Sequence, residues 1–228
     1  MLALLYDTHG NLKALDAVLE DAHAAGADRW LLGGDYASFG GWPAETVARL
    51  RELEGAQWIR GNADRWLARA DELPPEAPTH AALAAAREAL GPDVVAELVA
   101  LPERLTLAEG SFSHASPLND MESFGPEPGD DDERLLDGVV ATRFVFGHTH
   151  VQFTREGPGG VQLVNPGSVG IPLDGDRRAA YALLHDDGRV EPRRVAYDFE
   201  ASAARIGERF DGAPWTEIFA TRIRTARF

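Results

Sequence analysis

The sequence predicts a single α/β domain, and three features of the 228-residue chain indicate it. Apolar runs alternate with amphipathic segments in the first third, an Ala-rich helical stretch follows, and short strands with Gly-containing turns fill the second half. Repeated strand–helix units favour a parallel sheet covered by helices, and the hairpin-like second half favours a second, mainly antiparallel sheet. Because a chain of this length can bury one sizeable core, we expect residues 1–228 to form one domain.

The first third is expected to alternate strands and helices. Each apolar burst is followed by a turn and then by apolar residues at helical spacing, with Gly26 closing the first helix and Pro43 opening the second. The expected elements are strands at residues 2–6, 29–34 and 56–62, and helices at residues 11–26 and 43–53.

Two segments interrupt the strands. Residues 66–103 predict a helical insertion that covers one edge of the core, either as an ordinary packing helix or as a lid over a substrate. Residues 121–137 are acidic and predict a solvated, mobile surface loop. The prolines that bound the insertion are Pro74, Pro75, Pro78 and Pro102. The hairpin strands are expected within residues 105–116, 142–150, 151–168 and 179–197.

Composition limits the possible chemistry. The chain has no cysteine, which excludes disulfides, thiolate ligands and a Cys nucleophile, so any metal must be bound by nitrogen and oxygen atoms. The formal net charge is −15 and Lys13 is the only lysine, which argues against binding of long nucleic acid. A small phosphorylated substrate remains compatible, because bound divalent cations reverse the local field of an acidic site.

The first residues, MLALLYDTHG, lack a basic region and reach Asp7, which predicts a buried strand and not a signal peptide. No apolar run approaches the roughly 20 residues that cross a bilayer. We therefore expect a cytoplasmic protein without a membrane partner. Trp42, Trp58 and Trp66 suit a core or an interface equally well, so a homo-oligomer stays open.

Potential metal ligands follow the expected strands, at the edge where open α/β sheets bind ligands. They are Asp7, His9, Asp35, Asn62, His114, His148 and His150. Two pairs are spaced i, i+2, and strand alternation would direct both members of each pair to one face. One tetrahedral metal leaves three of the seven unused, whereas two metals that share a bridging carboxylate use all of them. The alternative is that these residues are caps and turn formers.

The order of the motifs is specific. DTHGN, GDYASFG, GNAD, the His of SHAS, and GHTH follow one another between Asp7 and His150. This pattern resembles the calcineurin-like metallophosphoesterases, whose signature runs DxH, GDxxxxG, GNxD, H and GHxH. NPGSVG at residues 165–170 extends the similarity to the small phosphodiesterase branch of bacteria and archaea. The resemblance implies a four-layer α/β/β/α sandwich of two mixed sheets flanked by helices.

The same resemblance implies a dinuclear centre. Asp7, His9 and His150 would hold one divalent cation, Asn62, His114 and His148 the other, and Asp35 would bridge them. A hydroxide between the two cations would attack phosphorus in line. Mn, Fe, Zn and Ni all suit nitrogen and oxygen ligands. Asp35, Asn62 and Asp64 are then the residues expected to act in catalysis.

The family pattern is broken at Ala63. Many relatives carry a His there that is thought to protonate the leaving oxygen, a contribution of about 10²–10⁴-fold. Without it, the chain is expected to favour leaving groups of low pKa or to recruit another acid. His80 is the candidate, with a solvated surface residue as the alternative. Asp64 is expected either to orient a ligand His or to cap a turn or helix.

Four residues are candidates for substrate binding. Gly10 and Asn11 open the first helix, whose free N–H groups could hold an anion. Arg60 and Arg65 flank the GNAD motif, and one of them could pair with a phosphate oxygen. The two histidines expected to be structural are His23 and His185.

The favoured function is hydrolysis of small phosphodiesters. A phosphomonoesterase that acts on phosphoproteins or nucleotides is an alternative that the motifs leave open. A third, from another class, is a non-catalytic metal-binding scaffold, since some relatives of this fold serve as scaffolds in complexes such as retromer. All seven expected ligand residues are present, which favours an enzyme over the scaffold.

Overall fold

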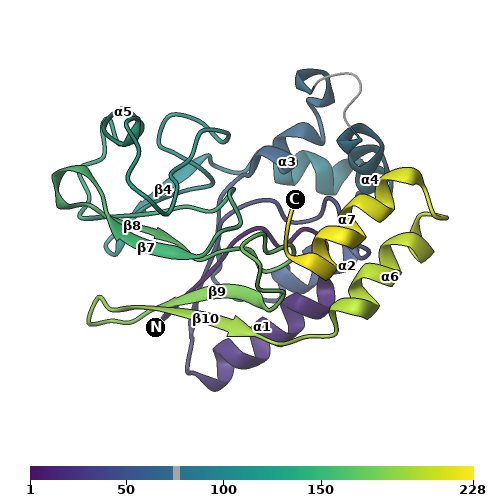
Figure 1. Cartoon of the computed structure of the whole chain (residues 1–228), viewed down its shortest axis with the longest axis horizontal. Helices are drawn as coiled ribbons and strands as arrows, with labels where there is room; N and C mark the ends of the chain where they lie inside the picture. The colour runs from purple at the N-terminus through teal and green to yellow at the C-terminus, as the bar shows by residue number, and fades with distance from the viewer. Residues whose placement is uncertain (74–77) are drawn as a thin grey trace.

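The computed structural model describes residues 1–73 and 78–228, so the predicted boundary prolines Pro74 and Pro75 lie outside the described residues. Two five-stranded sheets face each other and helices flank them, as the sequence predicts (Figure 1). The first sheet has the order β10 (Val190–Val195), β9 (Ala179–Leu184), β1 (Leu2–Leu5), β2 (Arg29–Leu32), β3 (Gln57–Trp58). The second has the order β4 (Arg104–Leu107), β5 (Gly110–Ser113), β6 (Arg143–Val145), β8 (Gln162–Asn165), β7 (Phe153–Glu156).

Strand β1 lies at the centre of the core. Leu2 and Leu4 pack between the two sheets, whereas Ala3 and Leu5 pack against the helices. All four residues are buried, so the strand reads as a continuous apolar run and not as an alternating one. β1, β2 and β3 are parallel, which brings their carboxyl ends to one end of the sheet.

The hairpin of β9 and β10 corrects the prediction that residues 179–197 belong to the second sheet. β9 pairs antiparallel with β1 and therefore lies inside the first sheet. All six of its residues are buried, with Ala182 between the sheets and Tyr181 against the helices. A strand that is apolar on both faces needs a covered layer on each side, and the position beside β1 provides both.

The second sheet is mixed, which corrects the expectation of a mainly antiparallel one. β4 pairs antiparallel with β5, and β7 with β8. β5, β6 and β8 run parallel to one another. Each sheet therefore contains three neighbouring parallel strands, and residues that follow their carboxyl ends can form a site.

Helices cover the outer face of the first sheet (Figure 1). They are α1 (Leu12–Ala24), α2 (Pro43–Arg51), α3 (Asn62–Trp66), α4 (Thr79–Val99), α6 (Phe199–Arg209) and α7 (Pro214–Thr225). Within the predicted insertion, α4 bends at Gly91 and Pro92 and buries an apolar face, so it is a packing helix. The short 3₁₀ helices are η1 (Ala70–Glu72) and η2 (Pro158–Gly160). The sequence analysis did not anticipate α6 and α7.

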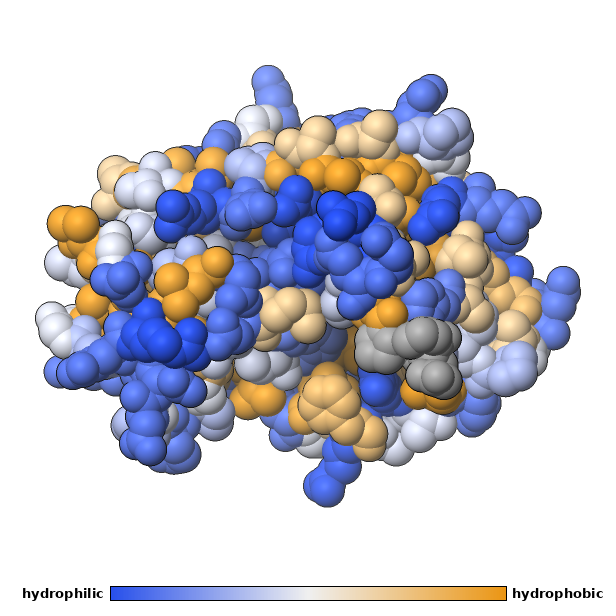
Figure 2. Space-filling model, turned by 90° about the horizontal axis from the view of Figure 1, so that it is seen from above, coloured by the Kyte–Doolittle hydropathy of each residue, from blue (hydrophilic) through white to orange (hydrophobic). Residues whose placement is uncertain are grey.

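The acidic segment 121–137 is anchored, which corrects the prediction of a solvated, mobile loop. It contains the short helix α5 (Asp132–Leu135) and buries Phe124 against Phe144 and Phe146 on the outer face of the second sheet. Figure 2 shows hydrophilic side chains gathered at the end of the molecule where α5 lies, with smaller hydrophobic patches among them. Most of its carboxylates face water, whereas Asp132 is buried and pairs with Arg155, so the aromatic ring and this ion pair both fix the backbone.

No helix in the described part of the chain combines the length and the apolar character that crossing a membrane requires.

Replacing Phe124 by Ala tests the anchoring of the acidic segment. Because the ring is 1% exposed and packs on two other rings, Phe124→Ala is expected to lower the free energy of unfolding by about 3 kcal/mol. Urea unfolding measures this, and limited proteolysis should cut within residues 121–137 of the variant. Leu118→Ala is the control, since Leu118 is 45% exposed. Equal stability of the two variants would contradict the anchoring.

Candidate metal centre

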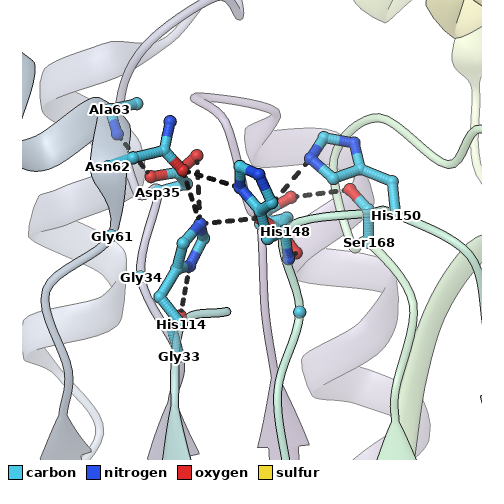
Figure 3. Close-up of polar contacts among 12 residues, drawn as sticks. Gly33, Gly34, Asp35, Gly61, Asn62, Ala63, His114, His148, His150 and Ser168 are labelled. Atoms are coloured by element: carbon cyan, nitrogen blue, oxygen red, sulfur yellow. Dashed lines mark hydrogen bonds and ion pairs between the residues drawn. The ribbon is translucent and has the colours of Figure 1, made fainter. Parts of the chain in front are cut away.

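All seven predicted ligands converge where the loops that follow five parallel strands meet. Figure 3 shows Asp35, Asn62, His114, His148 and His150 at this site. Asp7 and His9 follow β1, Asp35 follows β2, Asn62 follows β3 as the first residue of α3, His114 follows β5, and His148 and His150 follow β6. The first five are buried and the last two are partly buried. Side chains far apart in the sequence thus form one cluster between the two sheets.

The first group of ligand atoms comes from the DTHGN and GHTH motifs. Nε2 of His9 lies 3.1 Å from Nε2 of His150, and Oδ1 of Asp7 lies 3.4 Å from the latter atom and 3.9 Å from the former. A cation with ligand bonds of about 2.0–2.2 Å separates adjacent ligand atoms by roughly 3–3.5 Å. The three atoms therefore have the spacing of one metal's ligands, with modest contraction at the longest edge.

The second group lies beside the first. Oδ1 of Asn62 is 2.8 Å from Nε2 of His114 and 2.8 Å from Nδ1 of His148. Oδ2 of Asp35 is 3.6 Å from Nε2 of His114 and 3.8 Å from Nε2 of His9. The Asp35 carboxylate therefore faces both groups, while its other oxygen accepts a hydrogen bond from the backbone N–H of Ala63 at 2.8 Å.

Backbone carbonyls set the orientation of three imidazoles. Nδ1 donates to Ser38 O in His9 (3.2 Å), to Gly33 O in His114 (2.8 Å), and to Ile171 O in His150 (2.6 Å). Because a carbonyl can only accept, each neutral ring must carry its proton on Nδ1 and leave the lone pair of Nε2 free. This is the arrangement by which proteins orient a metal-binding His.

The buried carboxylates of the cluster would be stabilised by a bound cation. Oδ1 of Asp7 is buried and accepts no hydrogen bond from the described residues. Burial raises the pKa of Asp35 to about 7, and the Asp64 and Asp7 carboxylates add to that rise. Burial also lowers the pKa of His148 to about 4, which keeps it a neutral ligand. A divalent cation would give Asp7 its missing partner and offset the carboxylate charges, so these residues fit a metal.

The sequence of residues 1–189 matches the family model of the calcineurin-like phosphoesterase superfamily domain. The chain belongs to that superfamily. Its buried Asp and His clusters are consistent with a metal site typical of the superfamily.

Related proteins match nearly the whole chain. An uncharacterized protein of Methanocaldococcus jannaschii is 29% identical over 228 residues, covering 90% of this chain and 91% of that protein. The crystal structure of a metallophosphoesterase from Sphaerobacter thermophilus superposes with a TM-score of 0.83 at 26% identity and covers 99% of both chains. A hypothetical protein from Pyrococcus horikoshii shares the fold, with a TM-score of 0.79 at 21% identity over 96% of this chain and 98% of that one.

Five of the seven predicted ligand positions have a left-handed backbone. Their φ angles are 55° at Asp7, 46° at His9, 58° at Asp35, 66° at His148 and 59° at His150. Non-glycine residues rarely adopt this region, although Asp and His do so more readily than most, and such strain costs on the order of 1–3 kcal/mol each. The strain is concentrated where the ligands must turn inward.

This backbone corrects the reason given for the i, i+2 spacing. β1 ends at Leu5 and β6 ends at Val145, so neither pair of ligands lies on a strand. In each motif the two ligands have left-handed backbone and are separated by one Thr. The turn that results brings the two ligand side chains together. Convergence was predicted correctly, but the pleat of a strand does not cause it.

Asp64 of the GNAD motif is a backbone brace, the second of its two predicted roles. Its carboxylate accepts from the N–H groups of Asp35 (2.8 Å), Tyr36 (3.1 Å) and Gly61 (2.9 Å). The loop after β2 and the start of α3 are thereby joined. A side chain at Gly61 would meet Oδ1 of Asp35 at 2.1 Å, so only glycine allows this close approach.

The sequence analysis missed the residues that brace the ligand loops from the NPGSVG segment. Nδ2 of Asn165 donates to Gly147 O (3.0 Å) and to Oγ1 of Thr149 (2.9 Å), within the GHTH motif. Oγ of Ser168 donates to Asp7 O (2.8 Å). NPGSVG was interpreted from the sequence only as a family signature. Asn165 is the last residue of β8, and this position at a strand end was the signal that the segment contacts the site.

The predicted substrate-binding arginines are already paired. Arg65 binds Asp120 through two hydrogen bonds of 2.7 and 2.8 Å and also pairs with Glu72. Arg60 donates to Val99 O at 3.1 Å and to Glu103 at 2.5 Å. These contacts give the phosphate role of either arginine no support.

Gly10 and Asn11 are likewise engaged. The N–H of Gly10 donates to Tyr36 O and that of Asn11 to Thr8 O, so these two amides are not free for an anion. The Asn11 side chain caps α1 and also donates to Gly170 O at 2.8 Å. Their position shapes the loop around His9 without offering a donor to a substrate.

The remaining residues have simple placements. The side chain of Ala63 is a buried methyl group, which cannot donate a proton. His80 lies in the first turn of α4, outside both groups of ligand atoms. Nδ1 of His23 donates to Leu19 O at 2.6 Å, and the ring packs on Trp30. His185 pairs with Glu191, which agrees with a structural role.

Removing the Asp64 carboxylate tests the brace. Asp64→Ala leaves three buried N–H groups without an acceptor, each costing about 1–3 kcal/mol, so the free energy of unfolding is expected to fall by about 3 kcal/mol or more. Urea unfolding of the metal-free protein measures the loss. Asp71→Ala, at a side chain that is 76% exposed, should change it by less than about 0.5 kcal/mol. Similar values for both variants would refute the brace.

Metal affinity is expected to weaken as the pH falls below 7. Because the pKa of Asp35 is raised to about 7 and a cation binds the carboxylate form, binding below this pH must displace a proton. The affinity should then drop about tenfold per pH unit on account of this group, and level off above pH 8. Calorimetric titration with Mn²⁺ in buffers of different ionisation enthalpy counts the protons released. Release that is unchanged in Asp35→Asn would contradict this assignment.

Proposed function

We propose that this chain is a dinuclear metal-dependent phosphodiesterase that hydrolyses small phosphodiesters. The observation that supports it most is the place of Oδ2 of Asp35, which lies within 3.8 Å of Nε2 of His9 and within 3.6 Å of Nε2 of His114. A carboxylate oxygen between two ligand groups suits centres whose cations are about 3.5–4 Å apart.

The residues of each group would hold one cation. Asp7, His9 and His150 would bind the first, Asn62, His114 and His148 the second, and Asp35 both. Two bound cations supply positive charge that lowers the pKa of a water molecule and neutralises phosphoryl oxygens. Mn, Fe, Zn and Ni all suit this ligand set.

The protein's own part is to hold the ligand atoms in place before substrate arrives. Carbonyl groups fix three imidazoles, and Asp64 ties the loop of Asp35 to the start of α3. Five of the seven residues are buried and the other two are partly buried, so the ligand atoms need little reorganisation when charge develops on phosphorus. The 26% identical protein from Sphaerobacter thermophilus, described as a metallophosphoesterase, supports this reaction class.

Ala63 is the reason to favour activated diesters. A buried methyl group cannot protonate the leaving oxygen, so that oxygen departs as an anion unless another group supplies a proton. Leaving groups of low pKa are then cleaved fastest. This argues against simple alkyl phosphomonoesters as substrates.

The test compares two esters with the same leaving group. Wild-type protein loaded with Mn²⁺ is expected to hydrolyse bis(p-nitrophenyl) phosphate with a higher kcat/KM than p-nitrophenyl phosphate. Asp35→Asn should lower the diester rate by at least about 10³-fold, because it removes the charge that both ligand groups share. Asp28→Asn is the matched control, because the Asp28 side chain is 73% exposed and lies at the opposite end of β2 from Asp35.

Two results would contradict the proposal. A preference for the monoester would indicate a phosphomonoesterase. Tight metal binding without hydrolysis of either ester, with each of the four metals, would indicate a binding role and not an enzyme of this class.

A further inference from the structure

The C-terminal helix α7 lies beyond the residues that match the family model, yet a stack of aromatic rings connects it to the metal centre. The ring of Phe39 lies 5.4 Å from that of His9 and 4.4 Å from that of Phe219 in α7, to which it is almost parallel. Phe39 has a φ of 82°, which is exceptional for a bulky residue. Strain kept beside a functional cluster points to a role in that cluster.

Arg222 continues this stack. Its guanidinium carbon lies 5.1 Å from the ring of Phe219 and 5.3 Å from the ring of Phe228. Rings over a guanidinium hold it by cation–π attraction and leave its N–H edge free to bind a planar or tetrahedral anion.

Arg222 also lacks an acidic partner. Its Nε is buried without a hydrogen bond, and it forms no ion pair with any described residue. The chain has 37 acidic and only 22 basic residues, so a carboxylate is easy to find; Arg224, two positions away, pairs with Glu200. Burial lowers the pKa of Arg222, as expected for a cation whose charge is not compensated. An anion from outside the chain would remove this cost.

The end of α7 is tied to the loop beside the metal centre. Ala226 O accepts from the N–H of Gly175, and the N–H of Leu173, in the same loop, donates to His150 O. In Figure 1 the end of α7, drawn in yellow, lies near the middle of the molecule, next to the loops at the strand ends. The backbone that carries Arg222 is therefore joined, through Ala226 and Gly175, to the loop that contacts His150.

We propose that Arg222 binds a second anionic group of the substrate, so that the enzyme selects phosphodiesters in which one ester arm carries a phosphate or a carboxylate. This inference rests on the proposed phosphodiesterase function. Three successive ring contacts separate Arg222 from His9, so a short alkyl or aryl ester cannot reach both, whereas a molecule of nucleotide size can. The guanidinium accepts either anion in a two-bond arrangement.

The first experiment uses matched substrates with the wild-type, Mn²⁺-loaded protein. One pair is the p-nitrophenyl ester of thymidine 5′-phosphate with and without a 3′-phosphate. The other is the same thymidine ester with a 3′-O-methyl group and with a 3′-O-carboxymethyl group, so that the carboxylate also lies at nucleotide reach. We expect KM to be about 10- to 100-fold lower for the charged member, the size of a charge-assisted hydrogen-bonded contact. The pair with the larger difference identifies phosphate or carboxylate as the group that is bound.

The second experiment uses variants of α7. Arg222→Gln should bring the KM ratio within a pair close to one, and Arg222→Lys, which keeps the charge but not the planar fork, should keep part of the preference. Arg224→Gln is the matched control on the same helix and should keep the full preference, since its partner Glu200 lies on α6. Thermal unfolding checks that each variant is folded.

The outcomes separate the two proposals. If wild-type protein cleaves bis(p-nitrophenyl) phosphate but has equal KM values within both pairs, or if folded Arg222→Gln keeps the preference, the role of Arg222 is refuted and the phosphodiesterase function stands. If no diester is cleaved, both fail. If Arg222→Gln does not fold, the wild-type ratios and Arg222→Lys still decide.

Discussion

The burial of two carboxylates, Asp7 and Asp35, among four imidazoles is the constraint on which the rest of the site depends. An uncompensated buried charge is costly, and an oxygen atom without any donor adds to that cost. A cation reverses both effects. The chain therefore has to hold its ligand atoms at metal spacing even though they repel one another without the metal, and the strained backbone and the braces around the site serve that purpose.

Side-chain hydrogen bonds brace the ligand loops from two sides of the site. Asp64 collects three N–H groups from the loop after β2 and the start of α3. On the opposite side, Asn165 donates hydrogen bonds to the loop of the GHTH motif, and Ser168, three residues later, donates one to the backbone of Asp7. The segment after β8 thus fixes one ligand loop from each sheet at the same time. Left-handed backbone at the ligands is stable only because such contacts surround it.

The sequence was sufficient for the ligands and the layers, because each ligand directly follows an apolar run and parallel strands share one edge. It was insufficient wherever the outcome depended on contacts between distant segments. The pairing of β9 with β1 depends on which layers cover it, and the acidic segment is fixed by the burial of Phe124 and Leu135 on the second sheet and by the ion pair of Asp132 with Arg155. The left-handed turns at Asp7 and His148 depend on hydrogen bonds from other loops. The pairing of Arg65 with Asp120 joins residues 55 apart, which no local pattern indicates.

The wide separation of the ligands along the chain has a consequence for folding kinetics. His9 and His150 are 141 residues apart and lie in loops that follow strands of different sheets, so the first group of ligands cannot assemble before the two sheets have docked. Closing so long a loop is entropically costly, and contacts of this kind form late in folding. A cation that binds only the assembled cluster stabilises the native state without stabilising the transition state that precedes it. Supply of metal in the cell would then leave the rate of folding almost unchanged and lengthen the lifetime of the folded molecule.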